Sequence, residues 1–206
     1  MRPYLLIISI SLLPFFSIAQ KPNGNSREVQ SKAGFGFNSK TRIISFGLGV
    51  PNLYRINYDE PPGYAHVKTT GFGPIYAKFE IAATGNIGIV PAFGYSTFHY
   101  SYQDPLRIIY YDDVNTINLS LSGNYHFKKL FSNPRVDFYA GLGIAMNYLR
   151  SLYGNIPPYK QPESKTYFKP CGRIGMRYYI DPIFGLYAEG GYDGLSILQL
   201  GLSVKF

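Results

Sequence analysis

Hydrophobic residues alternate with small or polar residues along most of the chain after residue 40. In the segment 41–50, Ile44, Phe46, Leu48 and Val50 share one parity, while serine and glycine occupy the other. Successive side chains of a β-strand point to opposite faces, so this period of two predicts a strand with one apolar face. The same period predicts seven further strands, at 72–82, 87–98, 115–127, 135–148, 166–180, 184–192 and 196–206.

The lengths of these segments and of their connections fit a barrel that crosses a membrane. A tilted strand needs about ten residues to cross the hydrocarbon core. The connections 51–71, 99–114 and 149–165 are long and polar, whereas the second, fourth and sixth strands end in short turns. Transmembrane barrels have short turns on one side and long loops on the other. We therefore predict an all-β fold, an eight-stranded antiparallel up-and-down transmembrane β-barrel over residues 41–206.

The residues opposite the apolar ones indicate which face of the barrel meets lipid. Glycine, alanine, serine, asparagine and tyrosine dominate this second face, whereas a water-facing surface carries far more lysine and glutamate. Its few charges are mixed in sign, and inside a barrel they would be close enough to pair. They are Lys78, Glu80, Asp137, Arg173, Arg177 and Glu189. We predict that the apolar face contacts lipid and that this polar cluster fills the bore; a narrow channel is an alternative.

The first 40 residues do not show the period of two. Arg2, a following apolar stretch and the small residues before Gln20 have the order of a secretory signal peptide, which we place at 1–19. Residues 20–40 are polar and rich in glycine, asparagine and serine, so we predict a flexible periplasmic lead-in.

Composition excludes several classes of function. The formal net charge is +8, but no run of basic residues is dense enough to favour nucleic acid. The single cysteine, Cys171, excludes an internal disulfide and a zinc site with several cysteine ligands. The 3 histidines are scattered, so we expect neither a metal nor a cofactor. His126 has inner-face parity and is expected to be a structural partner of Asn124 or Tyr139.

The last residues carry a pattern of their own. It consists of a polar residue, a glycine and spaced apolar residues: Gln199, Gly201, Leu202, Val204 and Phe206. This pattern resembles the C-terminal assembly signal of Gram-negative outer-membrane barrels. Over about residues 41–206 the chain resembles the broad family of small outer-membrane β-barrels. The resemblance implies location in the outer membrane, contact with its lipid and lipopolysaccharide, and insertion by the barrel-assembly machinery.

The function expected from these features is structural, adhesive or accessory to a membrane complex, and not enzymatic. The long loops are rich in tyrosine, which gives contact area at a low cost in entropy. They are therefore the candidates for binding a protein or a glycan.

One short stretch, residues 98–102 (FHYSY), raises an enzymatic alternative. His99 and Ser101 are two residues apart on one strand face, and Asp112 and Asp113 follow about a dozen residues later. The His-x-Ser spacing is similar to that of the outer-membrane lipid A deacylases, which implies a catalytic dyad facing lipid. The chain departs from that family in having Tyr102 where an asparagine follows the serine, and in placing the dyad on the third strand. A lipid-modifying hydrolase using His99, Ser101 and Asp113 is therefore the alternative to an interfacial histidine among tyrosines.

Overall fold

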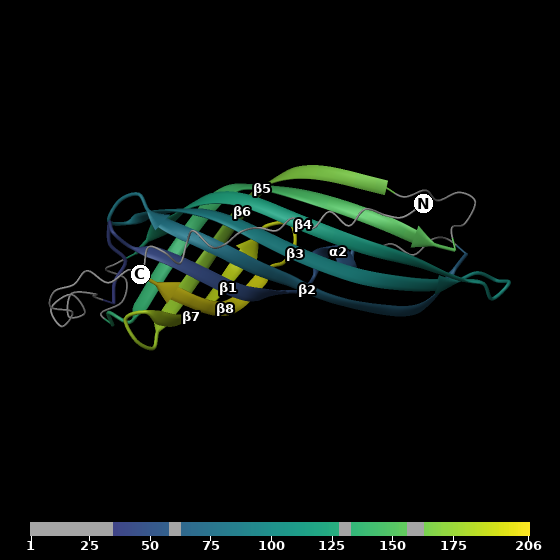
Figure 1. Ribbon diagram of the computed structural model, residues 1–206, viewed down its shortest axis with the longest axis horizontal. Helices are drawn as coiled ribbons and strands as arrows, with labels where there is room; N and C mark the ends of the chain where they lie inside the picture. The colour runs from purple at the N-terminus through teal and green to yellow at the C-terminus, as the bar shows by residue number, and fades with distance from the viewer. Residues whose placement is uncertain (1–34, 58–62, 128–132, 156–162) are drawn as a thin grey trace, which may run out of the picture. The chain divides into compact units, whose positions relative to one another are not determined.

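The computed structural model describes residues 35–57, 63–127, 133–155 and 163–206. In this part of the chain, consecutive strands pair antiparallel and β1 pairs with β8, which closes a barrel (Figure 1). The strands are β1 (Arg42–Val50), β2 (Ala65–Ala82), β3 (Ile87–Gln103), β4 (Ile109–His126), β5 (Val136–Gly154), β6 (Glu163–Tyr179), β7 (Phe184–Tyr192) and β8 (Leu198–Lys205). The predicted eight-stranded up-and-down barrel is confirmed. The predicted signal peptide at 1–19 and most of the predicted lead-in lie outside the described residues.

The apolar parity faces outward, as the alternation predicted. Phe46 on β1, Leu142 on β5 and Leu202 on β8 are among the large apolar side chains that point away from the barrel, with 59%, 79% and 61% exposed. A continuous outward belt of this kind would be unfavourable in water and indicates a wall that contacts lipid. Among the described residues, no helix is long and apolar enough to span a membrane.

Closure of the barrel depends on the first and last strands. Phe46 pairs with Leu202 and Gly47 with Gly201, and both backbone groups of Phe206 bond to Arg42. A Cβ atom on Gly47 would overlap the Tyr187 hydroxyl, and one on Gly201 would overlap the Phe46 carbonyl oxygen. The two glycines therefore leave room for an inward tyrosine where the closing strands meet.

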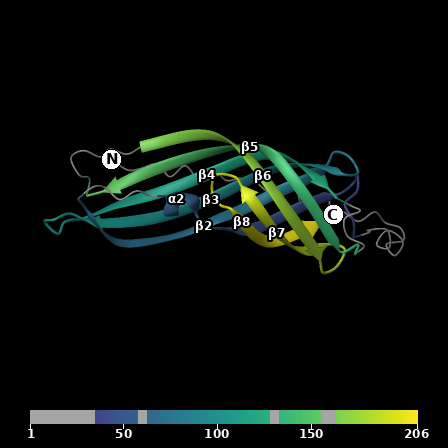
Figure 2. The same cartoon turned by 180° about the vertical axis from the view of Figure 1, so that it is seen from behind.

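The five strands β2–β6 are about twice as long as β1, β7 and β8 (Figures 1 and 2). β6 pairs with β7 only from Gly172 to Tyr179, and β2 pairs with β1 only from Ile75 to Ile81. The long strands thus continue beyond the closed barrel on the side that carries the β3–β4 and β5–β6 connections. We call this part the extracellular extension.

The predicted bounds of the long loops, 51–71, 99–114 and 149–165, were wrong, because strands occupy much of each of them. The alternation reverses in the extracellular extension: Phe98, Tyr100 and Tyr102 point inward and are buried, while polar residues of β3 point outward. The outward face of β3 beyond the lipid belt is polar, as a face that meets water is. The rule of apolar side chains outward therefore stops applying at the membrane boundary, although the strand continues.

Residues 35–40, which belong to the predicted lead-in, pack against the end of the barrel that carries the short turns. Phe37 is buried, and its ring stacks on His126 with a centroid distance of 3.5 Å. The Lys205 ammonium donates a hydrogen bond to the Phe35 carbonyl oxygen at 3.0 Å. This end of the bore is therefore covered by an aromatic side chain.

Candidate functional site

The structure places all six residues of the predicted polar cluster on the inner face. Arg177 Nη2 contacts Glu80 Oε2 at 2.5 Å and its Nη1 contacts Asp137 Oδ2 at 3.3 Å. Glu189 forms ion pairs with Lys78 and, at 3.7 Å, with Arg173. Each charge has a partner of opposite sign, which is what a buried ion requires to remain charged.

His126 lies within this cluster, opposite its expected partner Tyr139, whose ring lies 5.5 Å away, and its hydrogen bonds go to two carboxylates. Its Nδ1 lies 2.7 Å from Asp137 Oδ1, and its Nε2 lies 2.9 Å from Glu80 Oε1. Asn124 donates to the same Glu80 oxygen at 3.0 Å. The inward parity of His126 was readable in the sequence, but its bond to Glu80 was not, because Glu80 lies on a strand that is distant along the chain.

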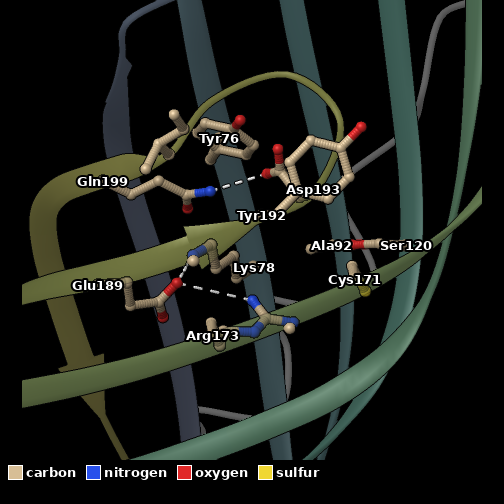
Figure 3. Close-up of a pocket in the computed structure, with 13 residues that line it drawn as sticks. Tyr76, Lys78, Ala92, Ser120, Cys171, Arg173, Glu189, Tyr192, Asp193 and Gln199 are labelled. Carbon is tan, nitrogen blue, oxygen red and sulfur yellow. Dashed lines mark hydrogen bonds and ion pairs between the residues drawn. The ribbon is translucent and has the colours of Figure 1, made fainter. Parts of the chain in front are cut away.

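Above the polar cluster, the β7–β8 connection folds into the bore (Figure 3). The Asp193 carboxylate accepts hydrogen bonds from the backbone of Leu195 and Ser196 and from Gln199 Nε2 at 2.8–3.0 Å. The side chain of Asn118 on β4 donates to the Asp193 carbonyl oxygen at 3.0 Å. Leu195 is fully buried. The inward fold of this connection was not predicted from the sequence.

The cavity beside these ion pairs is too small for a substrate. It has a volume of about 20 Å³ and lies between Asp193 and the ion pairs of Lys78, Arg173 and Glu189, with Cys171 on its wall (Figure 3). This volume holds about one water molecule. This cavity therefore cannot take a lipid or a sugar. Among the described residues, no group of three or more His, Cys, Asp or Glu could hold a metal ion.

The outer wall of the extracellular extension brings His99, Ser101 and Asp113 together. His99 and Ser101 point outward because their neighbours on β3 point inward, and Asp113 is the direct cross-strand partner of His99 on β4. His99 Nδ1 lies 2.7 Å from Asp113 Oδ1, and His99 Nε2 lies 3.1 Å from Ser101 Oγ. The His99 and Asp113 side chains are 39% and 49% exposed, so both remain accessible.

The order of these contacts is that of a nucleophile, a base and an orienting acid. A carboxylate only accepts hydrogen bonds, so Asp113 places the proton of a neutral His99 on Nδ1. Nε2 then carries the lone pair that accepts the Ser101 hydroxyl proton. We call Ser101, His99 and Asp113 the outer triad.

The alternation along β4 decides which of two adjacent acids belongs to the outer triad. Asp112 has inward parity, is fully buried and receives a 3.5 Å hydrogen bond from the Tyr102 hydroxyl. Asp113 points outward. Asp113 is the acid named from the sequence, and the alternation along β4 places it on the outward face and Asp112 on the inward one.

Two neighbours of the outer triad were not found from the sequence. The Tyr111 ring lies 5.4 Å from the His99 ring, and Tyr111 is the cross-strand partner of Ser101. A Cβ atom on Gly154, the partner of Tyr111 on β5, would overlap the Tyr111 ring. On the other side, Lys68 of β2 pairs with Ser101. The outward parity of Tyr111 and Lys68 could have identified them, but only the register of the strands shows that both lie beside Ser101.

The outer triad lies just beyond the apolar belt. On the outward face of β3, Ile89, Phe93 and Tyr95 precede Thr97, His99 and Ser101. The Tyr95 hydroxyl donates to Asn115 Oδ1 at 3.0 Å, as a tyrosine at a membrane interface can. The triad therefore follows the last outward aromatic residue of the apolar belt along β3.

Comparison with solved structures finds outer-membrane barrels. OprG from Pseudomonas aeruginosa matches with a TM-score of 0.52 and 12% identity, over 84% of this chain and 98% of that one. The N-terminal barrel domain of Pseudomonas aeruginosa OprF matches with a TM-score of 0.42 and 16% identity, over 82% and 98%. Ail, the attachment invasion locus protein of Yersinia pestis, matches with 0.45 and 14%, over 82% and 99%.

These matches establish the fold and leave the function open. The OprG match confirms that the chain has the architecture of an outer-membrane β-barrel. None of the three proteins is described as an enzyme, and identities this low show the fold alone. No protein-family model and no curated protein sequence matches the chain.

Proposed function

We propose that the protein is an outer-membrane hydrolase that cleaves acyl esters of lipids in the outer leaflet. The observation that supports this best is the unbroken line of contacts from Asp113 through His99 to Ser101 on an accessible surface that follows the apolar belt along β3. The proposal includes export by a signal peptide at 1–19, insertion by the barrel-assembly machinery, and contact with lipopolysaccharide and other outer-membrane lipid.

The chemistry follows from the two contacts of His99. Ser101 Oγ attacks the ester carbonyl carbon while its proton passes to His99 Nε2, and the carbonyl π electrons move to the oxygen. When the carbonyl re-forms, the alcohol leaves with the proton from His99, and the acyl group remains on Ser101. Water then attacks the acyl-serine, loses a proton to His99 and releases a fatty acid. That proton returns to Ser101 Oγ.

The filled interior supports an outer site. The cavity beside the polar cluster has a volume of about 20 Å³, and Ser101 points away from the bore, so a lipid reaches Ser101 along the outer wall. In this proposal, a lipid that diffuses in the plane of the membrane presents its ester at the level of Ser101 without leaving the bilayer.

The test compares wild type with Ser101→Ala and with a matched control, Ser164→Ala. Ser164 is an exposed serine of β6 that lies outside the outer triad. We expect the acyl pattern of lipid A and phospholipid from expressing cells to lose the deacylated species in Ser101→Ala and to keep them in Ser164→Ala. Identical patterns in all three strains would contradict the proposal.

A second candidate function is a structural or adhesive role through the extracellular extension. Leu106, at the tip of the β3–β4 connection, is 79% exposed, and Ile108 and Ile109 beside it are also exposed. Exposed apolar residues at a protruding tip are suited to contact with a protein or glycan partner. A photo-crosslinking residue at Leu106 in intact cells tests this role: a specific adduct is expected, and the absence of any adduct would exclude contact at this tip.

The inner face of the extracellular extension is better suited to stability than to recognition. Phe98, Tyr100, Tyr102 and Val114 form a buried cluster against which Tyr54 packs. Tyr54 lies on the short helix α2 (Leu53–Ile56), and burial raises the pKa of its hydroxyl to about 12, so that it stays protonated.

The narrow-channel alternative is tested by conductance in planar bilayers. Because side chains fill the bore, we expect no conductance.

A further inference from the structure

A serine nucleophile on a β-strand needs a source of oxyanion stabilisation. The usual donors are backbone N–H groups that point at the developing charge. In a sheet, however, these groups lie in the plane of the sheet and are used by the ladder. At Ser101, β3 is paired on both sides, with Lys68 of β2 and Tyr111 of β4. A side chain on the outward face must therefore supply the donor.

Three described side chains surround Ser101 on this face. Gln103 is the next outward residue of β3, and its Nε2 already donates to the Arg107 carbonyl oxygen at 3.0 Å. The Tyr111 ring lies over Gly154, 5.4 Å from the His99 ring, and a phenol donates a weaker hydrogen bond to an oxyanion than an ammonium does. Lys68 is exposed and forms no ion pair with a described carboxylate, so its ammonium is available.

The backbone of β2 is irregular beside Ser101. The register shifts between His66 and Lys68, so one extra residue, Val67, is inserted opposite the Ser101–Tyr102 step. Bulges of this kind redirect a neighbouring side chain and occur often beside active sites. Directly opposed residues on one face have Cβ atoms about 5 Å apart, which lies well within the reach of a lysine side chain.

We propose that Lys68 is a further catalytic residue, whose ammonium donates a hydrogen bond to the oxyanion that forms when Ser101 attacks the ester. This inference rests on the proposed hydrolase. The charges then balance: Asp113 faces the imidazolium of His99, and Lys68 faces the oxyanion. The interaction exists only while the oxyanion exists, so it acts on kcat and not on substrate affinity.

The experiment uses the purified, folded full barrel and an uncharged p-nitrophenyl ester, so that attraction to an anionic headgroup contributes nothing. Lys68→Met retains the aliphatic stem and removes the charge. We expect kcat to fall about 100-fold with KM nearly unchanged, and Lys68→Arg to restore part of the rate. The matched control is Lys165→Met, because Lys165 is an exposed lysine of β6 that pairs with Glu163 at 2.6 Å. Heat-modifiable gel mobility verifies that each variant is folded.

The outcomes separate the two proposals. An active wild type with an equally active Lys68→Met overturns the role of Lys68 and leaves the hydrolase intact. A change in KM alone also overturns it, because Lys68 would then bind the ground state. A wild type that is folded but inert towards every ester overturns the hydrolase and the role of Lys68 together.

Discussion

Two histidines of the barrel have nearly the same hydrogen-bond geometry and opposite surroundings. His126 Nδ1 and His99 Nδ1 each lie 2.7 Å from an aspartate oxygen, of Asp137 and Asp113 respectively. The second ring nitrogen of His126 meets Glu80 at 2.9 Å, whereas that of His99 meets Ser101 at 3.1 Å. The His126 side chain is fully buried, and that of His99 is 39% exposed.

The difference shows that a His–Asp pair takes its role from its surroundings. His126 has a carboxylate on each nitrogen and the Phe37 ring stacked on its face, so it holds strands together. His99 has one carboxylate and one hydroxyl, and its open side faces outward from the barrel. Packing and charge give His126 a structural role, whereas access to the Ser101 hydroxyl gives His99 the role of a base.

The largest expected effect on stability comes from breaking the inner pair. Glu80→Ala leaves the buried Arg177 and His126 with Asp137 as the one carboxylate that contacts both, which is expected to cost about 3–5 kcal/mol of stability. Urea titration of the barrel in vesicles measures this loss. Asp113→Ala on the exposed outer pair is the control and should cost less than about 1 kcal/mol; equal losses would contradict the assignment of roles.

The same Asp→Asn substitution in each His–Asp pair separates the roles of the two histidines. Asp113→Asn is expected to lower ester hydrolysis by a factor on the order of 10³–10⁴, because an amide no longer fixes the required tautomer of His99. Asp137→Asn makes the same chemical change on the inner pair and should leave kcat unchanged while lowering stability. Steady-state kinetics and urea titration of both variants check this; loss of activity in both would indicate that the outer triad is not specific.

A smaller effect is expected at Gly154, which has no chemical role of its own. Gly154→Ala places a methyl group where the Tyr111 ring lies, so the ring must move towards His99 and Ser101. We expect kcat to fall about 10-fold, within the range that small misplacements produce. In Gly154→Ala combined with Tyr111→Ala the methyl group no longer meets the ring. The double variant should therefore match Tyr111→Ala alone, and a further loss of kcat would count against this explanation.

The smallest effect is expected at Phe37. Phe37→Leu retains an apolar cover over His126 and removes only the ring stacking, so stability should fall by about 0.5–1.5 kcal/mol. The rate of ester hydrolysis should not change, because Phe37 lies at the short-turn end of the bore and the outer triad lies on the outer wall of the extracellular extension. A measurable change in kcat would mean that the two histidines are coupled through the barrel.

The sequence was sufficient to place the strands whose outward face contacts lipid along its whole length. Within the lipid belt, outward positions are apolar and inward positions are small or polar, so β1, β7 and β8 could be placed almost to the residue. In the extracellular extension the outward face of β3 meets water and its inward face carries Phe98, Tyr100 and Tyr102. The contrast reverses there, and a rule based on lipid exposure predicts a loop.

The candidate site was only partly predictable for a related reason. The alternation along β3 places His99 and Ser101 on one face, and this can be read from the local sequence. The sequence named Asp113, but its position opposite His99 depends on the register of β3 and β4, and the place of Lys68 depends on a bulge in β2. The bond of His126 to Glu80 depends on the register of β2, β3 and β4, which no local pattern encodes.

The most direct test of the account is covalent labelling of the folded barrel with an uncharged fluorophosphonate, followed by mass spectrometry of the peptides. We expect a single phosphonylated residue, Ser101, in the wild type, and at least a 100-fold slower reaction in His99→Ala, since the hydroxyl is then not activated. The absence of label on Ser101 of the folded wild type, or equal labelling in His99→Ala, would contradict the claim that this outer wall carries a hydrolytic site.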